Sequence, residues 1–536
     1  MQRRDLMRMA LLGAVGVGGA DAMGKSGPDD ARHGGMPIID ASVAELQAAM
    51  QSGRASSQSL VKAYLARIAA LDRAGPRLNS IIELNPDALE IAASLDRERK
   101  KSGPRGPLHG IPVLLKDNIA TADRMQTSAG SLALVGARAP RDAFIAARLR
   151  AAGAVILGKT NLSEWANLRS TRSTSGWSAR GGPTRNPYAL DRNTSGSSAG
   201  SGAAIAASLA AIAVGTETDG SITSPASICG LVGIKPTLGL LSRDGIVPIA
   251  HSQDTAGPMT RSVADAAVLL GAMTGIDARD AATAFSSGRT TDFTRFLDAD
   301  GLRGARIGVV RNAMGSNLRL QPIVDAALAT MKARGAILID VELPNMTKYG
   351  DSELEVLLYE FKADLNKYLA EFAQGAPART LAQVIAFNDN NRSREMPYFD
   401  QELLLRAEAK GGLDSKEYLD ALANNHRYSR AEGIDQVLQE HRLDALFAPT
   451  GGPAWLTDFV NADHSGDSFS SPAAVAGYPH VTVPAGLLAG LPVGVSFVGG
   501  AWSEGTLIKL AYAFEQATRH RRAPTYAAHA SVGVTI

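Results

Sequence analysis

The spacing of apolar and polar residues predicts helices near the start of the chain. Ser42 and Glu45 fit a capping box ahead of an apolar-periodic segment. Apolar side chains then recur at three- and four-residue intervals over residues 60–71. Pro86 occupies a favourable first position for a further helix over residues 87–100. We therefore expect this first part of the chain to fold mainly as helices.

From residue 107 onwards, short β-branched runs alternate with alanine-rich helical stretches. The strand-like runs cover 111–115, 154–157 and 210–214, and the helical stretches cover 143–152 and 200–209. Such alternation is typical of an α/β layered sheet. Later strand-like runs indicate that the chain returns to this sheet; they cover 444–447, 481–483 and 493–498.

The region over residues 275–443 has a different pattern. Long helical patterns, such as 354–372 and 401–410, are separated by polar loops. We interpret this region as a helical insertion or cover. At about 150 residues per domain, a chain of 536 residues has room for several domains, but one large α/β domain with an insertion is equally allowed.

Residues 1–22 resemble a removable export signal. Arg3 and Arg4 begin a basic segment, an apolar run covers 9–19, and residues 20–22 read Ala-Asp-Ala, as at a cleavage site. Paired arginines are typical of a twin-arginine signal, the bacterial route for folded proteins. We therefore expect a periplasmic or secreted product; the alternative is a cytoplasmic tail with arginines paired by chance. The apolar run is too short to span a bilayer, so we expect no membrane association after its removal.

Composition and charge exclude several classes of partner and site. Lysine and arginine number 55, against 53 aspartates and glutamates, which gives a net charge of +2. This balance does not favour nucleic acid as a partner. The single cysteine, Cys229, can form neither an internal disulfide nor a zinc or iron–sulfur site. The nine histidines are scattered without ligand spacing, so we expect no metal.

Three short patterns match known motifs by their letters but are better interpreted as ordinary structure. Residues 153–160 fit the phosphate-loop expression, yet a strand lies between its glycines and the predicted helix precedes it. Residues 196–200 spell G-x-S-x-G without the apolar strand that a nucleophile elbow requires. Residues 59–62 spell S-x-x-K inside the predicted amphipathic helix.

Three other segments combine into a candidate site. Residues 194–202 contain only small residues, which suits a backbone that approaches a ligand closely. Residues 215–222 place a second serine, Ser221, in a turn-like sequence. Lys116 ends an apolar strand, so we expect it to be partly buried. Burial disfavours the ammonium form, which would let this lysine act as a base near neutral pH.

Together these segments resemble the amidase signature family. The resemblance covers about residues 42–274, with looser similarity over 444–516. Further motifs in the same order support it: Gly158–Trp165, Gly182–Pro187, Lys235–Thr237, Asp254–Ser262 and Gly490–Gly494. Matched residue by residue, the family's nucleophile corresponds to Ser221, its bridging serine with a cis peptide bond to Ser197, and its lysine to Lys116.

The resemblance also implies a fold and a domain organisation. The fold class is α/β, an α/β/α sandwich around a mixed, mostly parallel twisted sheet. A single amidase domain would span residues 37–536, with 275–443 as a helical elaboration covering the active site. The implied chemistry requires no cofactor.

These residue types suit a proton relay. Neutral Lys116 would accept a proton from Ser197, and Ser197 one from Ser221, whose oxygen would then attack an amide carbonyl and form an acyl-enzyme. Backbone N–H groups would stabilise the oxyanion. The oxyanion donors we expect are those of Thr218, Asp219, Gly220 and Ser221.

The chain departs from the family pattern D-x-G-G-S-x-R around the nucleophile. Glu217 replaces the first acid, Asp219 the first glycine, and Thr223 the arginine. Asp219 would oppose the oxyanion unless its carboxylate points away or accepts a substrate N–H. The resulting wording, G-T-E-T-D-G-S-I, resembles exported peptide amidases.

We therefore expect an exported monomeric amide hydrolase that removes the C-terminal amide of peptides and releases ammonia. Two alternatives share the signature: a broad-specificity amidase acting on aryl or alkyl amides, and the transamidating subunit of a tRNA amidotransferase, against which the export signal argues. A catalytically inactive binding protein is a third alternative, although all three catalytic positions are filled. A nucleotide-dependent enzyme using residues 153–160 is the fourth.

Overall fold

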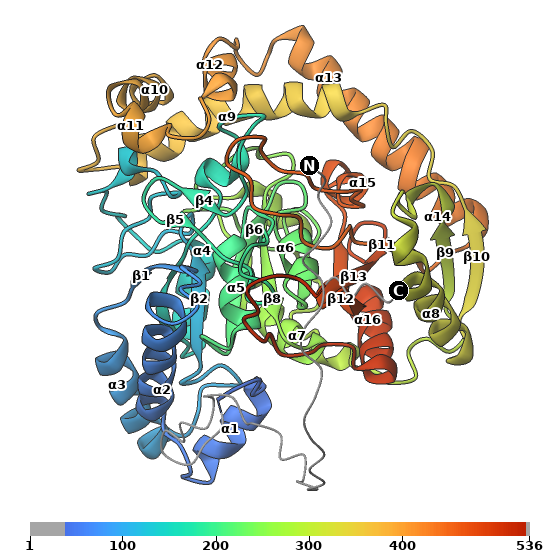
Figure 1. The fold of residues 1–536 in the computed structure, drawn as a ribbon, viewed down its shortest axis with the longest axis horizontal. Coiled ribbons are helices and arrows are strands. Elements are labelled where there is room, and N and C mark those ends of the chain that lie inside the picture. The colour runs from blue at the N-terminus through green and yellow to red at the C-terminus, as the bar shows by residue number, and fades with distance from the viewer. Residues whose placement is uncertain (1–37, 532–536) are drawn as a thin grey trace, which may run out of the picture.

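The computed structural model describes residues 38–531, which contain one large sheet flanked by helices (Figure 1). The sheet has eleven strands. In spatial order they are β1 (Ile81–Leu84), β3 (Val155–Thr160), β2 (Pro112–Lys116), β6 (Ile212–Glu217), β8 (Thr255–Thr260), β7 (Val232–Lys235), β12 (His480–Leu488), β13 (Leu491–Val498), β11 (Ala445–Pro449), β9 (Arg306–Val310) and β10 (Ile337–Val341). The α/β class and the mixed sheet are therefore confirmed.

The expectation of a mostly parallel sheet is wrong. Only the pairs β2–β3, β2–β6, β9–β10 and β9–β11 are parallel. The other six pairs of neighbours in the sheet are antiparallel. One reason is visible in β12 and β13, which a tight turn at Ala489 and Gly490 joins as a hairpin; a connection this short cannot make a parallel crossover.

The N-terminal helices have the positions that the sequence predicts. They are α1 (Val43–Gln51), α2 (Ser57–Ile68) and α3 (Ala88–Ser102). The predicted capping box is present, because the Ser42 hydroxyl accepts from the Glu45 N–H and the Glu45 carboxylate accepts from the Ser42 N–H. Residues 59–62 lie inside α2, as expected for an ordinary amphipathic helix.

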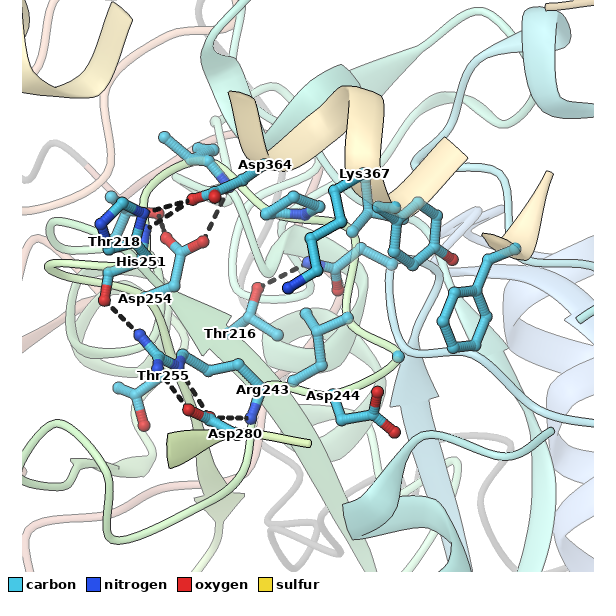
Figure 2. A pocket seen from close by; sticks show the side chains of 18 of the residues that line it. Thr216, Thr218, Arg243, Asp244, His251, Asp254, Thr255, Asp280, Asp364 and Lys367 are labelled. Atoms are coloured by element: carbon cyan, nitrogen blue, oxygen red, sulfur yellow. Dashed lines mark hydrogen bonds and ion pairs between the residues drawn. The ribbon is translucent and has the colours of Figure 1, made fainter. Parts of the chain in front are cut away.

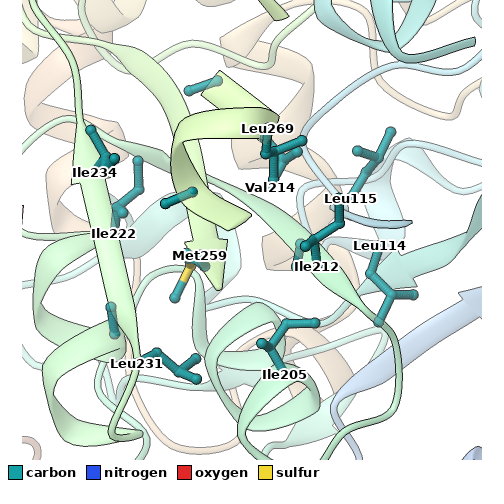
Figure 3. Close-up of a cluster of buried hydrophobic side chains, with 14 of the residues drawn as sticks. Leu114, Leu115, Ile205, Ile212, Val214, Ile222, Leu231, Ile234, Met259 and Leu269 are labelled. Carbon is teal, nitrogen blue, oxygen red and sulfur yellow. The ribbon is translucent and has the colours of Figure 1, made fainter. Parts of the chain in front are cut away.

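Six further helices surround the centre of the sheet, and each has a buried apolar face. These are α4 (Phe144–Ala151), α5 (Ala199–Ala206), α6 (Thr223–Ile228) and α7 (Val263–Met273), and near the C-terminus α15 (Ser471–Ala476) and α16 (Glu504–Thr518). Figure 3 shows Ile205 of α5 beside Leu114 of β2 and Ile212 of β6. One hydrophobic cluster extends from Ile38 to Phe514 and includes side chains of α4, α5, α6, α7 and α16, so these helices share a core. Helix α15 packs in a second cluster with Val310 and Phe469.

The region 275–443, predicted as a helical elaboration, contains strands as well as helices. Its strands β9 and β10 belong to the main sheet, and α8 (Gln321–Ala333) connects them. The two strands are short apolar runs that the long helical patterns around them obscure. The remaining helices form an arc along one side of the molecule (Figure 1): α9 (Gly350–Phe372), α10 (Leu381–Asn390), α11 (Arg392–Glu395), α12 (Glu402–Glu408) and α13 (Lys416–His426), followed by α14 (Asp435–His441).

The predicted export signal, residues 1–22, lies outside the described residues. Among the helices of residues 38–531, none combines the length and the apolar character needed to cross a membrane.

Candidate active site

Lys116 lies at the end of β2, between the parallel strands β3 and β6. Its side chain is fully buried. The ammonium nitrogen lies 2.7 Å from the Ser197 hydroxyl oxygen, and donates to the Thr216 carbonyl at 3.1 Å and the Thr216 hydroxyl at 2.9 Å. The strand therefore brings the predicted lysine and the predicted bridging serine into direct contact.

The environment of Lys116 disfavours its charged form. Burial lowers the pKa of this lysine to about 7, although the negative charges of Asp254 and Glu217 act in the opposite direction. Around neutral pH, a large fraction of the Lys116 side chains therefore lacks the proton and can accept one.

Ser197 belongs to the small-residue loop that precedes α5. The peptide bond between Gly196 and Ser197 is cis. A Cβ at Gly196 would lie 2.2 Å from the Ser163 hydroxyl oxygen, so any other residue here would force Ser163 to move. The Ser197 carbonyl accepts from the Ser163 N–H at 3.1 Å, which fixes the loop against its neighbour.

Ser221 lies in the turn between β6 and α6 and is 7% exposed. Its carbonyl accepts from the Ser198 N–H at 3.1 Å, so the turn and the small-residue loop are joined directly. Within residues 38–531, no hydrogen bond connects the Ser221 hydroxyl with that of Ser197. The structure thus brings Lys116 and Ser197 together and holds Ser221 in the adjoining turn.

The carboxylate of Glu217 holds the end of the turn in place through hydrogen bonds. This buried carboxylate accepts from the N–H groups of Ile222 at 2.7 Å and Thr223 at 2.8 Å, which are at the start of α6. Burial raises the pKa of Glu217, while the positive charge of Lys235 acts to lower it. The substitution of glutamate for the family's aspartate therefore keeps an acceptor for the first N–H groups of the helix.

The N–H groups of the turn remain available. In the described part of the chain, the N–H groups of Asp219, Gly220 and Ser221 donate to no protein acceptor. Gly220 has a φ of +76°, and a Cβ there would lie 3.0 Å from the Ser470 hydroxyl oxygen. Thr218, the remaining predicted oxyanion donor, is held in place by its side chain, whose hydroxyl donates to the Asp254 carboxylate at 2.6 Å.

The Asp219 carboxylate is held by neighbouring elements. It accepts from the Ser471 hydroxyl at 2.6 Å, at the start of α15. Glu353 of α9 faces it, and burial together with the nearby charge of Asp219 raises the pKa of Glu353 well above its usual range. The other Asp219 oxygen is buried without a hydrogen-bond donor. Two adjacent buried carboxyl groups in this position are best satisfied by sharing one proton.

A cavity of about 360 Å³ adjoins the lysine side of the site (Figure 2). It lies between the loop 243–249 and helix α9, and Lys367 reaches from that helix toward Thr216. Asn118 also lines it and donates to the Thr216 hydroxyl at 2.9 Å. Neither predicted catalytic serine lines this cavity, which contacts the site through Thr216, a partner of the lysine, and through Thr218 of the nucleophile turn.

Sequence reasoning missed several of these neighbours. Thr216 lies inside the predicted segment 215–222 and Asn118 follows Lys116 by two residues, but their contact with each other arises only when β2 and β6 pair. No motif or spacing in the sequence around Glu353 indicated that this residue would lie beside the nucleophile turn. The structure also gathers His251, Glu360 and Asp364, a group with the composition of a metal site; its members are paired with one another, with His251 2.8 Å from Asp364.

Comparisons with known proteins agree with the motifs. A family model described as Amidase matches residues 59–508. A protein of Arabidopsis thaliana named as a probable amidase is 43% identical over 502 residues, covering 92% of each chain. The solved structure of native peptide amidase from Stenotrophomonas maltophilia is 54% identical, with a TM-score of 0.88, and the match covers 91% of this chain and 99% of that one.

A structure of the peptide amidase PAM in complex with the competitive inhibitor chymostatin is also 54% identical. Its TM-score is 0.89, and the match covers 91% of this chain and all of that one. A family match over most of the length, together with relatives that align nearly end to end, leaves one assignment. The chain belongs to the amidase signature family, and it is an enzyme that acts on amides.

Proposed function

We propose that this amidase hydrolyses the C-terminal amide of peptides and releases ammonia, through an acyl-enzyme formed on Ser221. The observation that carries the proposal is the buried Lys116, whose nitrogen lies 2.7 Å from the Ser197 hydroxyl in a setting that lowers its pKa to about 7. Similarity to peptide amidases supports the substrate class.

In the first half of the reaction, the neutral Lys116 nitrogen takes the Ser197 hydroxyl proton while Ser197 takes the proton of Ser221. The Ser221 oxygen attacks the carboxamide carbon, and the carbonyl oxygen becomes an oxyanion. The N–H groups of the turn, which donate to no other protein group, stabilise this charge. The Ser197 hydroxyl then protonates the leaving nitrogen, recovering its own proton from Lys116, and ammonia departs.

In the second half, water attacks the acyl group on Ser221. The relay through Ser197 and Lys116 removes a proton from this water and returns one to the Ser221 oxygen as the ester bond breaks. The products are a peptide with a free carboxyl group and the regenerated enzyme. One water is consumed for each ammonia released.

The test is ammonia release from peptide amides, free amino-acid amides, aryl amides and alkyl amides. We expect peptide amides to have the highest kcat/KM, Ser221→Ala to abolish turnover, and a serine-directed phosphonofluoridate to label Ser221 alone. Labelling of Ser198 would contradict the assigned nucleophile. A preference for aryl or alkyl amides would instead favour a broad-specificity amidase.

We also propose that residues 1–22 direct export of the folded enzyme. The paired Arg3 and Arg4 followed by an apolar run support this proposal. In a bacterial host with a twin-arginine pathway, the wild-type protein should accumulate in the periplasm, and the double variant Arg3→Lys, Arg4→Lys should remain in the cytoplasm. Equal periplasmic amounts of both would contradict the proposal.

A further inference from the structure

A second hollow lies on the side of α6 away from the lysine. Its outer part is a cavity of about 280 Å³ that reaches Met314, Leu320 and His464. Its inner part reaches Ser224, Ser227 and Ile228 of α6. The two parts share walls and form one groove, which we call the glycine groove; the shared lining is Gly451, Gly452, Trp455, Gly466, Asp467 and Ser468.

The inner end of the glycine groove is close to the nucleophile. Ser224 follows Ser221 by three residues, and its N–H donates to the Gly220 carbonyl at 2.8 Å. The Ser224 hydroxyl lies 2.7 Å from that of Ser195, two residues before the bridging serine. On the opposite wall, Ser468 lies 3.1 Å from Ser470, the residue that packs against Gly220. The groove thus begins about one helical turn from Ser221.

The walls of the groove suit a peptide main chain. Gly451 pairs with Ser468 in an antiparallel bridge, and Gly452 and Gly466 face each other without side chains. Such walls let another backbone approach closely and exchange hydrogen bonds with them. Trp455, Met314 and Leu320 add apolar surface at the outer end, where a substrate side chain can pack.

The charges of the residues that line the groove also favour an uncharged segment of substrate. Among its described lining residues there is no lysine or arginine. One oxygen of the exposed Asp467 carboxylate accepts from the Ser316 N–H and from the Ser316 hydroxyl at 2.8 Å, which ties the groove wall to the neighbouring loop. His464 is paired with Asp458 at 3.5 Å. A free carboxylate would find no cationic partner here, whereas amide groups are satisfied by backbone.

We propose that the glycine groove binds the main chain of the substrate on the N-terminal side of the carboxamide, so that peptide amides bind more tightly than amino-acid amides. This inference rests on the proposed function. It assigns peptide length selectivity to the residues 451–468, which the three signature segments do not contain.

The test is Gly452→Ala. An added Cβ would have Gly466 Cα at 3.8 Å as its nearest neighbour, and Gly452 does not have a positive φ, so the free protein accommodates the methyl group. The methyl group would occupy the space of a bound main chain. We expect the ratio of kcat/KM for a tetrapeptide amide to that for an amino-acid amide to fall by about tenfold. Gly466→Ala, whose Cβ would lie 3.9 Å from Gly452 Cα, should do the same if the first variant folds poorly.

The matched control is Gly106→Ala in the loop before β2, where a Cβ meets nothing within 4 Å; it should leave the ratio unchanged. If the wild-type enzyme hydrolyses both substrates and neither groove variant changes the ratio, the groove assignment is wrong while the proposed function stands. If the wild-type enzyme hydrolyses neither substrate, the proposed function fails and the groove assignment fails with it.

Discussion

Burial of the Lys116 side chain changes an ordinary cation into a group that loses its proton near neutral pH. If its neutral form is the base, kcat/KM should fall below about pH 7 as the nitrogen becomes protonated, with the slope of a single proton. Lys116→Ala should lower kcat/KM by roughly 100- to 10,000-fold at neutral pH.

Lys159 provides the control for this pH profile. It is also buried, with a pKa lowered by burial to about 8, but it donates to the Ile119 carbonyl and the Thr127 hydroxyl, not to Ser197. A Lys159→Met variant should therefore keep the acidic limb at the same pH. A Lys116→Ala enzyme with near wild-type activity would refute the relay.

Asp219 is better explained as a support of the turn than as a contact to substrate. Its carboxylate accepts from Ser471 and faces Glu353, so both neighbours draw it away from the oxyanion. Asp219→Asn should lower kcat/KM about fivefold, to the same extent on a dipeptide amide and on a simple alkyl amide, because an amide can still bond to both neighbours at a cost of about 1 kcal/mol. Selective loss on the dipeptide amide, measured by ammonia release, would instead assign Asp219 to peptide binding.

At the residue scale, local sequence patterns identified site residues that lie within one segment, and they missed contacts between residues that are far apart in the sequence. Lys116 could be predicted to be buried because it ends an apolar strand. The hydrogen bond from Asn118 to Thr216 spans 98 positions of sequence, and the contact of Glu353 with Asp219 spans even more. No periodicity or short motif carries such information, because it depends on which strands and helices become neighbours.

At the scale of elements, the short helix α6 depends on the carboxylate of Glu217. Helix starts have N–H groups without partners, and this buried acceptor satisfies those of Ile222 and Thr223. Glu217→Ala should lower the free energy of unfolding by about 1–3 kcal/mol and reduce kcat/KM, since the N–H groups beside Ser221 lose their support. Glu217→Gln should lose less stability and less activity, because the amide oxygen can still accept from the N–H groups of Ile222 and Thr223. Urea denaturation and ammonia release measure the two effects.

Glu45 serves as the control for that variant. It accepts from the Ser42 N–H at 2.8 Å in the capping box of α1, far from the site in sequence and exposed to solvent. Glu45→Ala should cost about 1 kcal/mol or less of stability and leave kcat/KM unchanged. A Glu217→Ala enzyme with wild-type stability and activity would show that α6 needs no such cap.

Element positions were more predictable than element directions. The run 354–372 corresponds to α9 and the run 493–498 lies within β13, since both patterns are long or strongly apolar. Strand direction depends on which strands become neighbours, and β8 runs against both β6 and β7 even though helices lie nearby in the chain. Alternating strands and helices therefore predicted the layered fold but overestimated its parallel part.

At the scale of the whole molecule, helix α9 connects the arc of helices to the catalytic half of the sheet. Glu353 on this helix faces the nucleophile turn, and Asp364 and Glu360 hold His251 of the opposite loop. The same loop contributes Asp254, which accepts from Thr218. The position of helix α9 therefore affects the geometry of the nucleophile turn, because side-chain contacts of Glu353, Glu360 and Asp364 connect the two.

The pairing of His251 gives this docking a pH dependence. Burial acts to lower the pKa of His251, but the hydrogen bond to Asp364 and the charges of Asp364 and Glu360 outweigh it and raise the pKa above 6.5; Arg243 nearby acts to lower it. A raised folded-state pKa contributes stability that is fully present below pH 6.5 and lost as pH rises through the folded value. Because the side chain is 44% exposed, we expect less than about 1 kcal/mol.

The measurement is hydrogen exchange of the α9 amides between pH 6 and 8.5, corrected for the intrinsic effect of pH. Protection of α9 in the wild-type enzyme should decrease across this range, and His251→Asn, which cannot be protonated, should remove most of the decrease. Amides of α2, which lies among the N-terminal helices, should behave alike in both proteins. An unchanged decrease in His251→Asn would place the titrating group elsewhere, with Glu360, whose carboxyl pKa burial raises, as the next residue to substitute.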